Sequence, residues 1–233
     1  NILFGNALLS YKDRGFWNPF LDYKGKNCVF WPHFGEFGFY IIYYARITYF
    51  IDCNKKIVIC PEDYSILHSN CEFCYLENIF TDKIRDGFIA KRSDYKKYCY
   101  EKAREIVENK GYYLIRPTFN LPQSHLLKYL KFPVNVSKND INEEVDVVIA
   151  PRMREWCSHR NIPRDFWIEL VEKLKELNYI VAVGGAKESS FDIPNADLYS
   201  WDYNNETFGS AALLRKCNLL ICTNSGMGHL AAN

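Results

Sequence analysis

The sequence LLICTNSGMGHLAA, from Leu219 to Ala232, contains the pattern that decides the fold. Four apolar residues lead into the polar stretch Thr223–Gly226, and the HLAA that follows is typical of a helix. An apolar run, a glycine-containing turn and a helix in this order are typical of a strand–turn–helix unit. Glycines let the backbone approach a ligand closely, and the free N–H groups of a first helical turn attract anions. The stretch therefore predicts a phosphate-binding turn at the end of a buried strand.

The residues before this stretch alternate between predicted strands and predicted helices. Val145–Ala150, Ile180–Val183 and Asn218–Cys222 are short apolar runs of the kind that form buried strands, while Asp165–Asn178 and Glu206–Cys217 have the composition and spacing of helices. Parallel strands need crossovers of this length and are buried on both faces. The order predicts a doubly wound α/β domain, with ligands beyond the carboxyl ends of its strands.

The first half of the chain shows a weaker version of the same alternation. Cys28–Trp31, Lys56–Cys60 and Tyr112–Ile115 predict strands, and Tyr95–Asn109 predicts a charged amphipathic helix. Phe39–Cys53 is rich in β-branched and aromatic residues, which favour a strand. Its length and its position after a glycine-containing turn favour a helix instead, and a helix is our prediction.

A polar stretch, Ser137–Glu144, separates the two halves and predicts a domain boundary. We expect a first domain over residues 1–140 and a second over residues 145–233.

The 29 Lys and Arg residues nearly balance the 28 Asp and Glu residues, so no basic excess indicates a nucleic-acid partner. No apolar run reaches the length of a membrane span. The nine cysteines have no repeated spacing, and Cys71 and Cys74 form a lone pair without further metal ligands, so we expect reduced thiols in a cytoplasmic protein.

Several motifs together resemble a known family. Asn224–Ala232 resembles the D-S-G-x-x-H-L-A-A segment of the heptosyltransferase-like glycosyltransferases. Arg160–Trp167 is similar to that family's K-x-W-P-x-x-x-W stretch, and Tyr179–Glu188 to its strand, glycine pair and acidic residue. Phe34–Gly38 looks like the family's G-E-I-G-D loop. The resemblance implies the GT-B architecture, in which two Rossmann-like domains face each other across a cleft.

The sequence also departs from the family pattern. Asn224 replaces the aspartate before Ser-Gly, and Phe39 replaces the aspartate that is the family's usual catalytic base. Arg160 stands in place of the lysine, and Ile162 in place of the first tryptophan. Donor binding therefore carries over better than catalysis does. The family pattern continues with further strand and helix after Asn233, so the second domain is expected to be incomplete.

The resemblance implies a glycosyltransferase of glycan synthesis. Such an enzyme moves a sugar from a nucleotide-diphosphate donor to an acceptor hydroxyl, and we expect inversion at the sugar, no metal and no cofactor. The partners would be the nucleotide sugar and a glycan or small-molecule acceptor, which could bring the protein to a membrane surface. The oligomeric state is not indicated. Two alternatives stay open: a sugar-nucleotide epimerase on the same fold, and a non-catalytic relative that binds nucleotide or sugar.

The chemistry of this transfer selects the candidate site residues. The leaving diphosphate needs N–H donors or positive charge, and the planar fork of arginine binds two oxygens at once. The predicted donor-binding residues are Arg152, Arg154, Arg160, Gly184, Gly185, Glu188, Asn224, Ser225, Gly226, Met227, Gly228 and His229. The acceptor hydroxyl needs a base, for which Glu36 is the first candidate and His33 the second.

Each of these residues also has a purely structural interpretation. The arginines would then form a solvated basic loop, and His229 would cap or pack in the first turn of its helix. Glu36 would complement a helix dipole, and Glu188 would be a surface acid.

Overall fold

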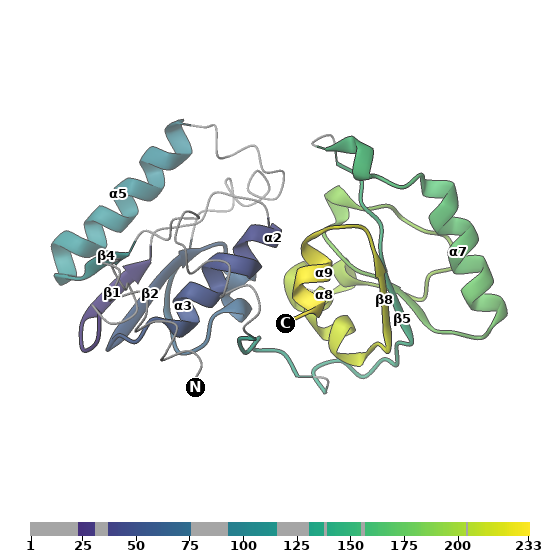
Figure 1. Ribbon diagram of the computed structural model, residues 1–233, viewed down its shortest axis with the longest axis horizontal. Helices are drawn as coiled ribbons and strands as arrows, with labels where there is room; N and C mark the ends of the chain where they lie inside the picture. The colour runs from purple at the N-terminus through teal and green to yellow at the C-terminus, as the bar shows by residue number, and fades with distance from the viewer. Residues whose placement is uncertain are drawn as a thin grey trace, which may run out of the picture.

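The structure is a computed structural model that describes residues 23–30, 37–75, 93–115, 131–137, 139–154, 157–203 and 205–233. These ranges form two α/β units side by side (Figure 1), and each unit contains a four-stranded parallel sheet. Every strand pair in both sheets is parallel. This confirms the predicted α/β fold. The two sheets are separated in the chain by residues 116–146, and the proposed domain boundary lies within this interval.

The sheet of the first unit has the order β3-β2-β1-β4. Its strands are β1 (Asn27–Phe30), β2 (Lys55–Cys60), β3 (Glu72–Tyr75) and β4 (Tyr113–Ile115). Three of them confirm predicted strands. The strand β3 was missed because it is a partly exposed edge strand of only four residues, EFCY, with neither an alternating pattern nor a continuous aliphatic run.

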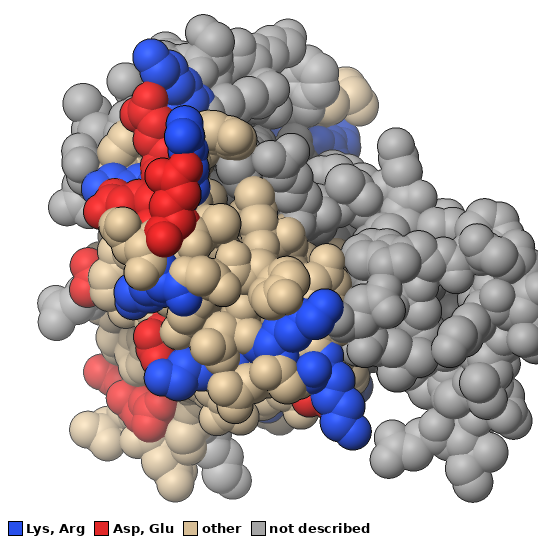
Figure 2. Space-filling model, turned by 90° about the vertical axis from the view of Figure 1, so that its left-hand side faces the viewer, with Lys and Arg blue, Asp and Glu red and all other residues tan. Residues whose placement is uncertain are grey.

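The helix α5 (Ser93–Lys110) confirms the predicted charged helix and lies on the outside of the first unit (Figure 1). Acidic and basic side chains are mixed along this face (Figure 2), with i,i+4 ion pairs between Lys97 and Glu101 and between Arg104 and Glu108. Exposed pairs of this kind contribute only a few tenths of a kcal/mol each. The described part of α5 thus carries charged side chains of both signs.

The aromatic segment after β1 is helical, as predicted. It consists of α2 (Phe37–Phe39), a π-helical turn (Tyr40–Ala45) and α3 (Arg46–Phe50). Burial of large side chains such as Tyr44 and Ile47 holds the segment on the sheet, which overrides the strand propensity of its residues. At its end, Lys56 Nζ donates to the carbonyl oxygens of Thr48 and Tyr49 at 2.7 and 3.0 Å. These bonds satisfy acceptors that the end of a helix leaves open.

The sheet of the second unit has the order β7-β6-β5-β8, which repeats the topology of the first. Its strands are β5 (Val147–Ala150), β6 (Val181–Val183), β7 (Leu198–Tyr199) and β8 (Leu219–Cys222). Its helices are α7 (Arg164–Glu176), α8 (Glu206–Lys216) and α9 (Gly226–Ala231). All were predicted except β7, which is too short to show a pattern.

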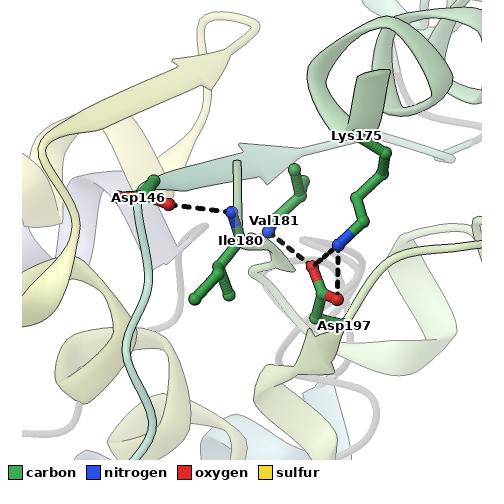
Figure 3. Close-up of polar contacts among 5 residues, drawn as sticks. All are labelled: Asp146, Lys175, Ile180, Val181 and Asp197. Carbon is green, nitrogen blue, oxygen red and sulfur yellow. Dashed lines mark hydrogen bonds and ion pairs between the residues drawn. The ribbon is translucent and has the colours of Figure 1, made fainter. Parts of the chain in front are cut away.

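Two carboxylates hold the amino ends of these strands together (Figure 3). Asp146 accepts a bond from the Ile180 N–H at 2.8 Å, and Asp197 accepts one from the Val181 N–H at 2.8 Å. Lys175 Nζ lies 2.6 and 2.7 Å from the two oxygens of Asp197. The loops at the opposite, carboxyl edge of the sheet line a cleft together with residues of the first unit, as described below.

The apolar core crosses from one unit to the other. One cluster contains Tyr64 and Leu67 of the first unit together with Ala211, Leu213 and Leu230 of the second. The two units therefore pack through apolar side chains.

Among the described residues, no helix is long and apolar enough to pass through a membrane, and no group of three or more His, Cys, Asp and Glu side chains could bind a metal ion.

A buried histidine links the helical segment to the rest of the first unit. His68 is 2% exposed; its Nε2 lies 2.6 Å from the Tyr40 hydroxyl and its Nδ1 2.7 Å from Thr48 Oγ1. Because Thr48 donates its proton to the carbonyl oxygen of Ala45, it accepts from an Nδ1–H, and Nε2 accepts from Tyr40. Burial, with a smaller contribution from the charge of Lys56, lowers the pKa of His68 to about 3.

This burial predicts a stability that falls at acid pH. Between pH 6.5 and about 3 the unfolded chain binds a proton at His68 that the folded chain does not, so stability is fully present above pH 6.5 and is lost as the pH falls. At pH 5 we expect a loss of about 2 kcal/mol from this residue in the free energy of unfolding. Urea unfolding at pH 8 and pH 5 measures it, and His68→Asn should show a smaller difference between the two. An equal difference in both proteins would refute the assignment.

A close contact fixes α8 against the preceding turn. A Cβ at Gly209 would lie 2.1 Å from the carbonyl oxygen of Ser200 and 2.8 Å from Tyr203 Cδ2. The backbone therefore leaves no room for a side chain at this position.

We expect Gly209→Ala to lower the free energy of unfolding by about 1–3 kcal/mol, the usual range for overpacking. Gly228→Ala is the matched control, since its new Cβ would meet only Cys222 Sγ at 3.4 Å. Thermal unfolding of both variants measures the difference. Equal melting temperatures would show that the turn moves aside without cost.

Candidate active site

A cleft of about 320 Å³ lies between the two units. The first unit contributes Phe37, Gly38, Ile42 and Tyr64. The second unit contributes the segments that follow β5, β6 and β8 and the start of α8, namely residues 150–152, 154, 160, 184–186, 189, 206–207, 210, 224–227 and 229. Ten of the twelve predicted donor-binding residues are in this lining. Glu188 and Gly228 are not.

The loop after β5 brings the arginines to the cleft. Arg152 is 5% exposed, and its Nη1 donates to the carbonyl oxygen of Cys157 at 3.0 Å and to Asn161 Oδ1. The Asn161 side chain also accepts from the Arg154 N–H at 3.4 Å and donates to the Arg154 carbonyl oxygen at 2.8 Å. Asn161 thus fixes the backbone of the arginine loop. The sequence analysis did not single it out, because its position two residues before Pro163 carries no chemical signal of its own.

A hydrogen bond joins the arginine loop to the turn after β8. Arg160 Nη1 donates to the carbonyl oxygen of Asn224 at 3.3 Å. Asn224, Ser225 and Gly226 also line the cleft. The two segments that the sequence analysis proposed for the diphosphate therefore lie next to each other, although they are about sixty residues apart in the chain.

The glycine pair after β6 makes two different contributions. A Cβ at Gly184 would lie 2.6 Å from Met227 Cε, so this glycine permits close packing of two cleft segments. Gly185 has φ +116°, a conformation that side-chain-bearing residues rarely adopt. Its N–H donates to Ser210 Oγ at 3.2 Å and its carbonyl oxygen accepts from Ser200 Oγ, so the loop is fixed at both backbone groups.

The acidic residue of the cleft differs from the predicted one. Glu188 is exposed in the short 3-10 turn Lys187–Ser189, whereas Glu206 lies in the lining. Glu206 Oε1 accepts from the Lys187 N–H at 3.1 Å. Its position in the first turn of a helix after the carboxyl edge of the sheet was the signal that could have identified it.

An asparagine side chain caps the start of α8. Asn205 accepts a hydrogen bond from the Phe208 N–H at 2.8 Å and so caps the helix. Thr207, in the first turn of α8, is 7% exposed and lines the cleft.

The two units approach each other closely where α2 contacts α9. A Cβ at Gly226 would lie 2.6 Å from Phe37 Cδ1 and 3.2 Å from the Gly38 nitrogen. A Cβ at Gly38 would lie 3.0 Å from His229 Cδ2. The absence of side chains at these two glycines lets the helices approach, which places His229 at the junction of the units.

The ionisable groups of the cleft are mainly cationic. Arg152, Arg154 and Arg160 are in the lining, and Glu206 is its one carboxylate among the described residues. Burial lowers the pKa of His229, and the positive charge of Arg46 adds to the effect. The imidazole is therefore neutral near pH 7. Glu36 and His33, the predicted catalytic residues, lie outside the described residues, so their role stays a prediction.

The contacts of Asn161 predict a structural effect of its removal. Asn161→Ala would leave the Arg154 carbonyl oxygen and the buried Arg152 guanidinium short of a partner, so we expect the free energy of unfolding to fall by about 1–3 kcal/mol. Asn54→Ala, which removes one exposed hydrogen bond to Asn27, should change it by less than about 0.5 kcal/mol. Urea unfolding measures both changes. Equal losses would mean that Asn161 does not hold the loop.

No protein-family model matches the chain, and no curated protein is significantly similar to it in sequence. Solved structures do match. The ADP-heptose LPS heptosyltransferase II of E. coli matches with a TM-score of 0.53 at 14% identity, over 88% of this chain and 81% of that chain. A family 9 glycosyltransferase from Veillonella parvula matches with a TM-score of 0.53 at 9% identity, over 92% and 79%.

A third match is the iron-containing dodecameric glycosyltransferase TibC from enterotoxigenic E. coli. It has a TM-score of 0.51 at 15% identity and covers 91% of this chain but 56% of that chain. At these identities the likeness concerns the fold. The chain has an α/β fold with two parallel four-stranded sheets, resembling that of the GT-B heptosyltransferases.

Proposed function

We propose that the protein is a glycosyltransferase that moves a sugar from a nucleotide-diphosphate donor to an acceptor hydroxyl, with inversion and without a metal ion. The observation that carries this proposal is the meeting of the arginine loop and the turn after β8 at one side of a cleft between two α/β units. The fold adds support, because structures of the same architecture include glycosyltransferases.

Charge favours a diphosphate as the group bound there. The whole chain has a net charge of only +1, yet three arginines and one carboxylate line the cleft. The described lining of the cleft therefore has an excess of positive charge. When the bond between the sugar and the diphosphate breaks, negative charge develops on the leaving oxygens, and fixed guanidinium groups stabilise it.

The remaining polar groups of the cleft suit the hydroxyls of a nucleotide sugar. Glu206, Thr207 and Ser210 line the cleft near the start of α8. In contrast to the arginines, they carry a carboxylate and two hydroxyls, which form hydrogen bonds with neutral groups. A carboxylate repels phosphate but accepts bonds from hydroxyls. The volume of about 320 Å³ is at the lower end of the usual range for small-molecule sites, which is enough for part of a nucleotide sugar.

A second candidate is a non-catalytic protein that binds a nucleotide sugar. Phe39 favours it, because a phenylalanine stands where the resembling family has its catalytic aspartate. Turnover distinguishes the two functions. Release of nucleotide from ADP-, UDP- or GDP-sugars, measured with and without an added acceptor, indicates a transferase. Binding without release indicates a binding protein, and conversion of the sugar without acceptor would indicate an epimerase.

Binding of ADP tests the donor site directly. ADP is the first choice because a structure with this fold belongs to an ADP-heptose transferase. We expect Arg160→Ala to weaken ADP binding about tenfold or more, since a charge-assisted hydrogen bond contributes about 1.5–3 kcal/mol. Arg215→Ala is the matched control, because Arg215 is exposed in the last turn of α8, away from the cleft lining.

Isothermal titration calorimetry at one ionic strength gives both affinities. An equal loss of ADP affinity in the two variants would mean that the loss comes from the overall charge of the protein and not from a contact of Arg160. Unchanged affinity in Arg160→Ala would remove Arg160 from the donor site, and a lack of binding to ADP, UDP and GDP by the wild-type protein would overturn the proposed function.

A further inference from the structure

His229 occupies a position between the two units that no other ionisable residue of the described cleft lining shares. It belongs to α9 of the second unit, and α9 packs against α2 and the π-helical turn of the first unit as well as against α8 and β8. A Cβ at Gly38 would lie 3.0 Å from Cδ2 and 3.6 Å from Nε2 of the His229 ring. The edge of the ring that carries Nε2 therefore faces the first unit.

The other groups of the described lining that could take a proton are placed differently. Glu206 starts α8 in the second unit, and one of its oxygens already accepts from the Lys187 N–H. The Tyr64 hydroxyl belongs to a side chain that is 3% exposed and is an acid rather than a base near neutral pH. If the donor binds to the second unit through the arginine loop, an acceptor enters from the side of the first unit. The junction is then where the two substrates meet.

The protonation state of His229 suits a proton acceptor. Its pKa lies below 6.5, because burial disfavours the imidazolium ion and Arg46 on α3 repels it. Among the side chains that the structure describes, the other ionisable groups on the elements packed against α9 are Tyr40 and Tyr44 of the π-helical turn, Cys222 of β8, and Glu206, Arg215 and Lys216 of α8. Burial raises the pKa values of Tyr40, Tyr44 and Cys222, so these three are neutral.

We infer that His229 is the general base of the proposed transfer, an inference that rests on the proposed function. A ring nitrogen accepts the proton of the acceptor hydroxyl while the acceptor oxygen forms a bond to the anomeric carbon of the donor sugar. The bond between that carbon and the diphosphate oxygen breaks, and its electron pair leaves with the nucleoside diphosphate. The step needs no further reactant. His229 becomes an imidazolium ion as negative charge appears on the leaving group.

The test compares two histidine variants. His229→Gln keeps a polar side chain but cannot take up a proton, and His159→Gln is the matched control, since His159 is exposed and outside the cleft lining. Turnover is measured as nucleotide released from the ADP-, UDP- or GDP-sugar that the wild-type protein uses fastest, with water or an added alcohol as acceptor. ADP affinity is measured by calorimetry on the same samples, which also shows that each variant is folded.

We expect His229→Gln to lower turnover 100-fold or more and to leave ADP affinity within about threefold, because general bases contribute 10²–10⁴-fold to the rate. The wild-type rate should also fall tenfold per pH unit below the pKa of His229, and this dependence should be absent from the residual activity of His229→Gln. His159→Gln should match the wild type in all three measurements.

The remaining outcomes contradict the inference in distinguishable ways. Unchanged turnover in His229→Gln, with loss of turnover in Glu36→Gln, would assign the base to Glu36. A loss of ADP affinity as large as the loss of turnover would make His229 a donor contact. Wild-type protein that binds ADP but releases nucleotide from none of the donors would overturn the transferase itself, and with it this role of His229.

Discussion

The close approach of α2 and α9 is the constraint on which the rest of the structure depends. Gly226 lies against Phe37 and the backbone of Gly38, and a single Cβ at Gly226 would occupy the space that the first unit needs. This contact brings the carboxyl edge of the second sheet against the helical segment of the first unit. The same contact places His229 at the junction of the two units.

Rigidity around the cleft comes from polar side chains that do not themselves carry charge. Asn161 fixes the arginine loop, Ser200 and Ser210 hold the two backbone groups of Gly185, and Asn205 caps α8. Each satisfies backbone groups that irregular segments would otherwise leave open. The functional segments are therefore loops, yet their geometry is set by hydrogen bonds to a fixed scaffold, which favours binding with a small cost in conformational entropy.

His68 and His229 differ in burial, and their chemical possibilities differ accordingly. His68 is enclosed by a hydroxyl on each ring nitrogen, so burial dominates and its role is structural. His229 is only partly buried and lies at the cleft, where burial and the charge of Arg46 lower its pKa. A neutral ring that remains accessible can exchange a proton with a substrate, and an enclosed one cannot.

The sequence by itself determined the α/β alternation, because apolar runs and amphipathic helices are local patterns, and it also placed the arginine loop and the Asn224–Gly226 turn at strand ends. It missed β3 and β7, which are edge strands of four and two residues and therefore too short to form a pattern. Only the tertiary structure decided that Glu206 rather than Glu188 lines the cleft, and that His229 lies against the first unit. These facts depend on contacts between residues far apart in the chain, and such contacts leave no local trace in the sequence.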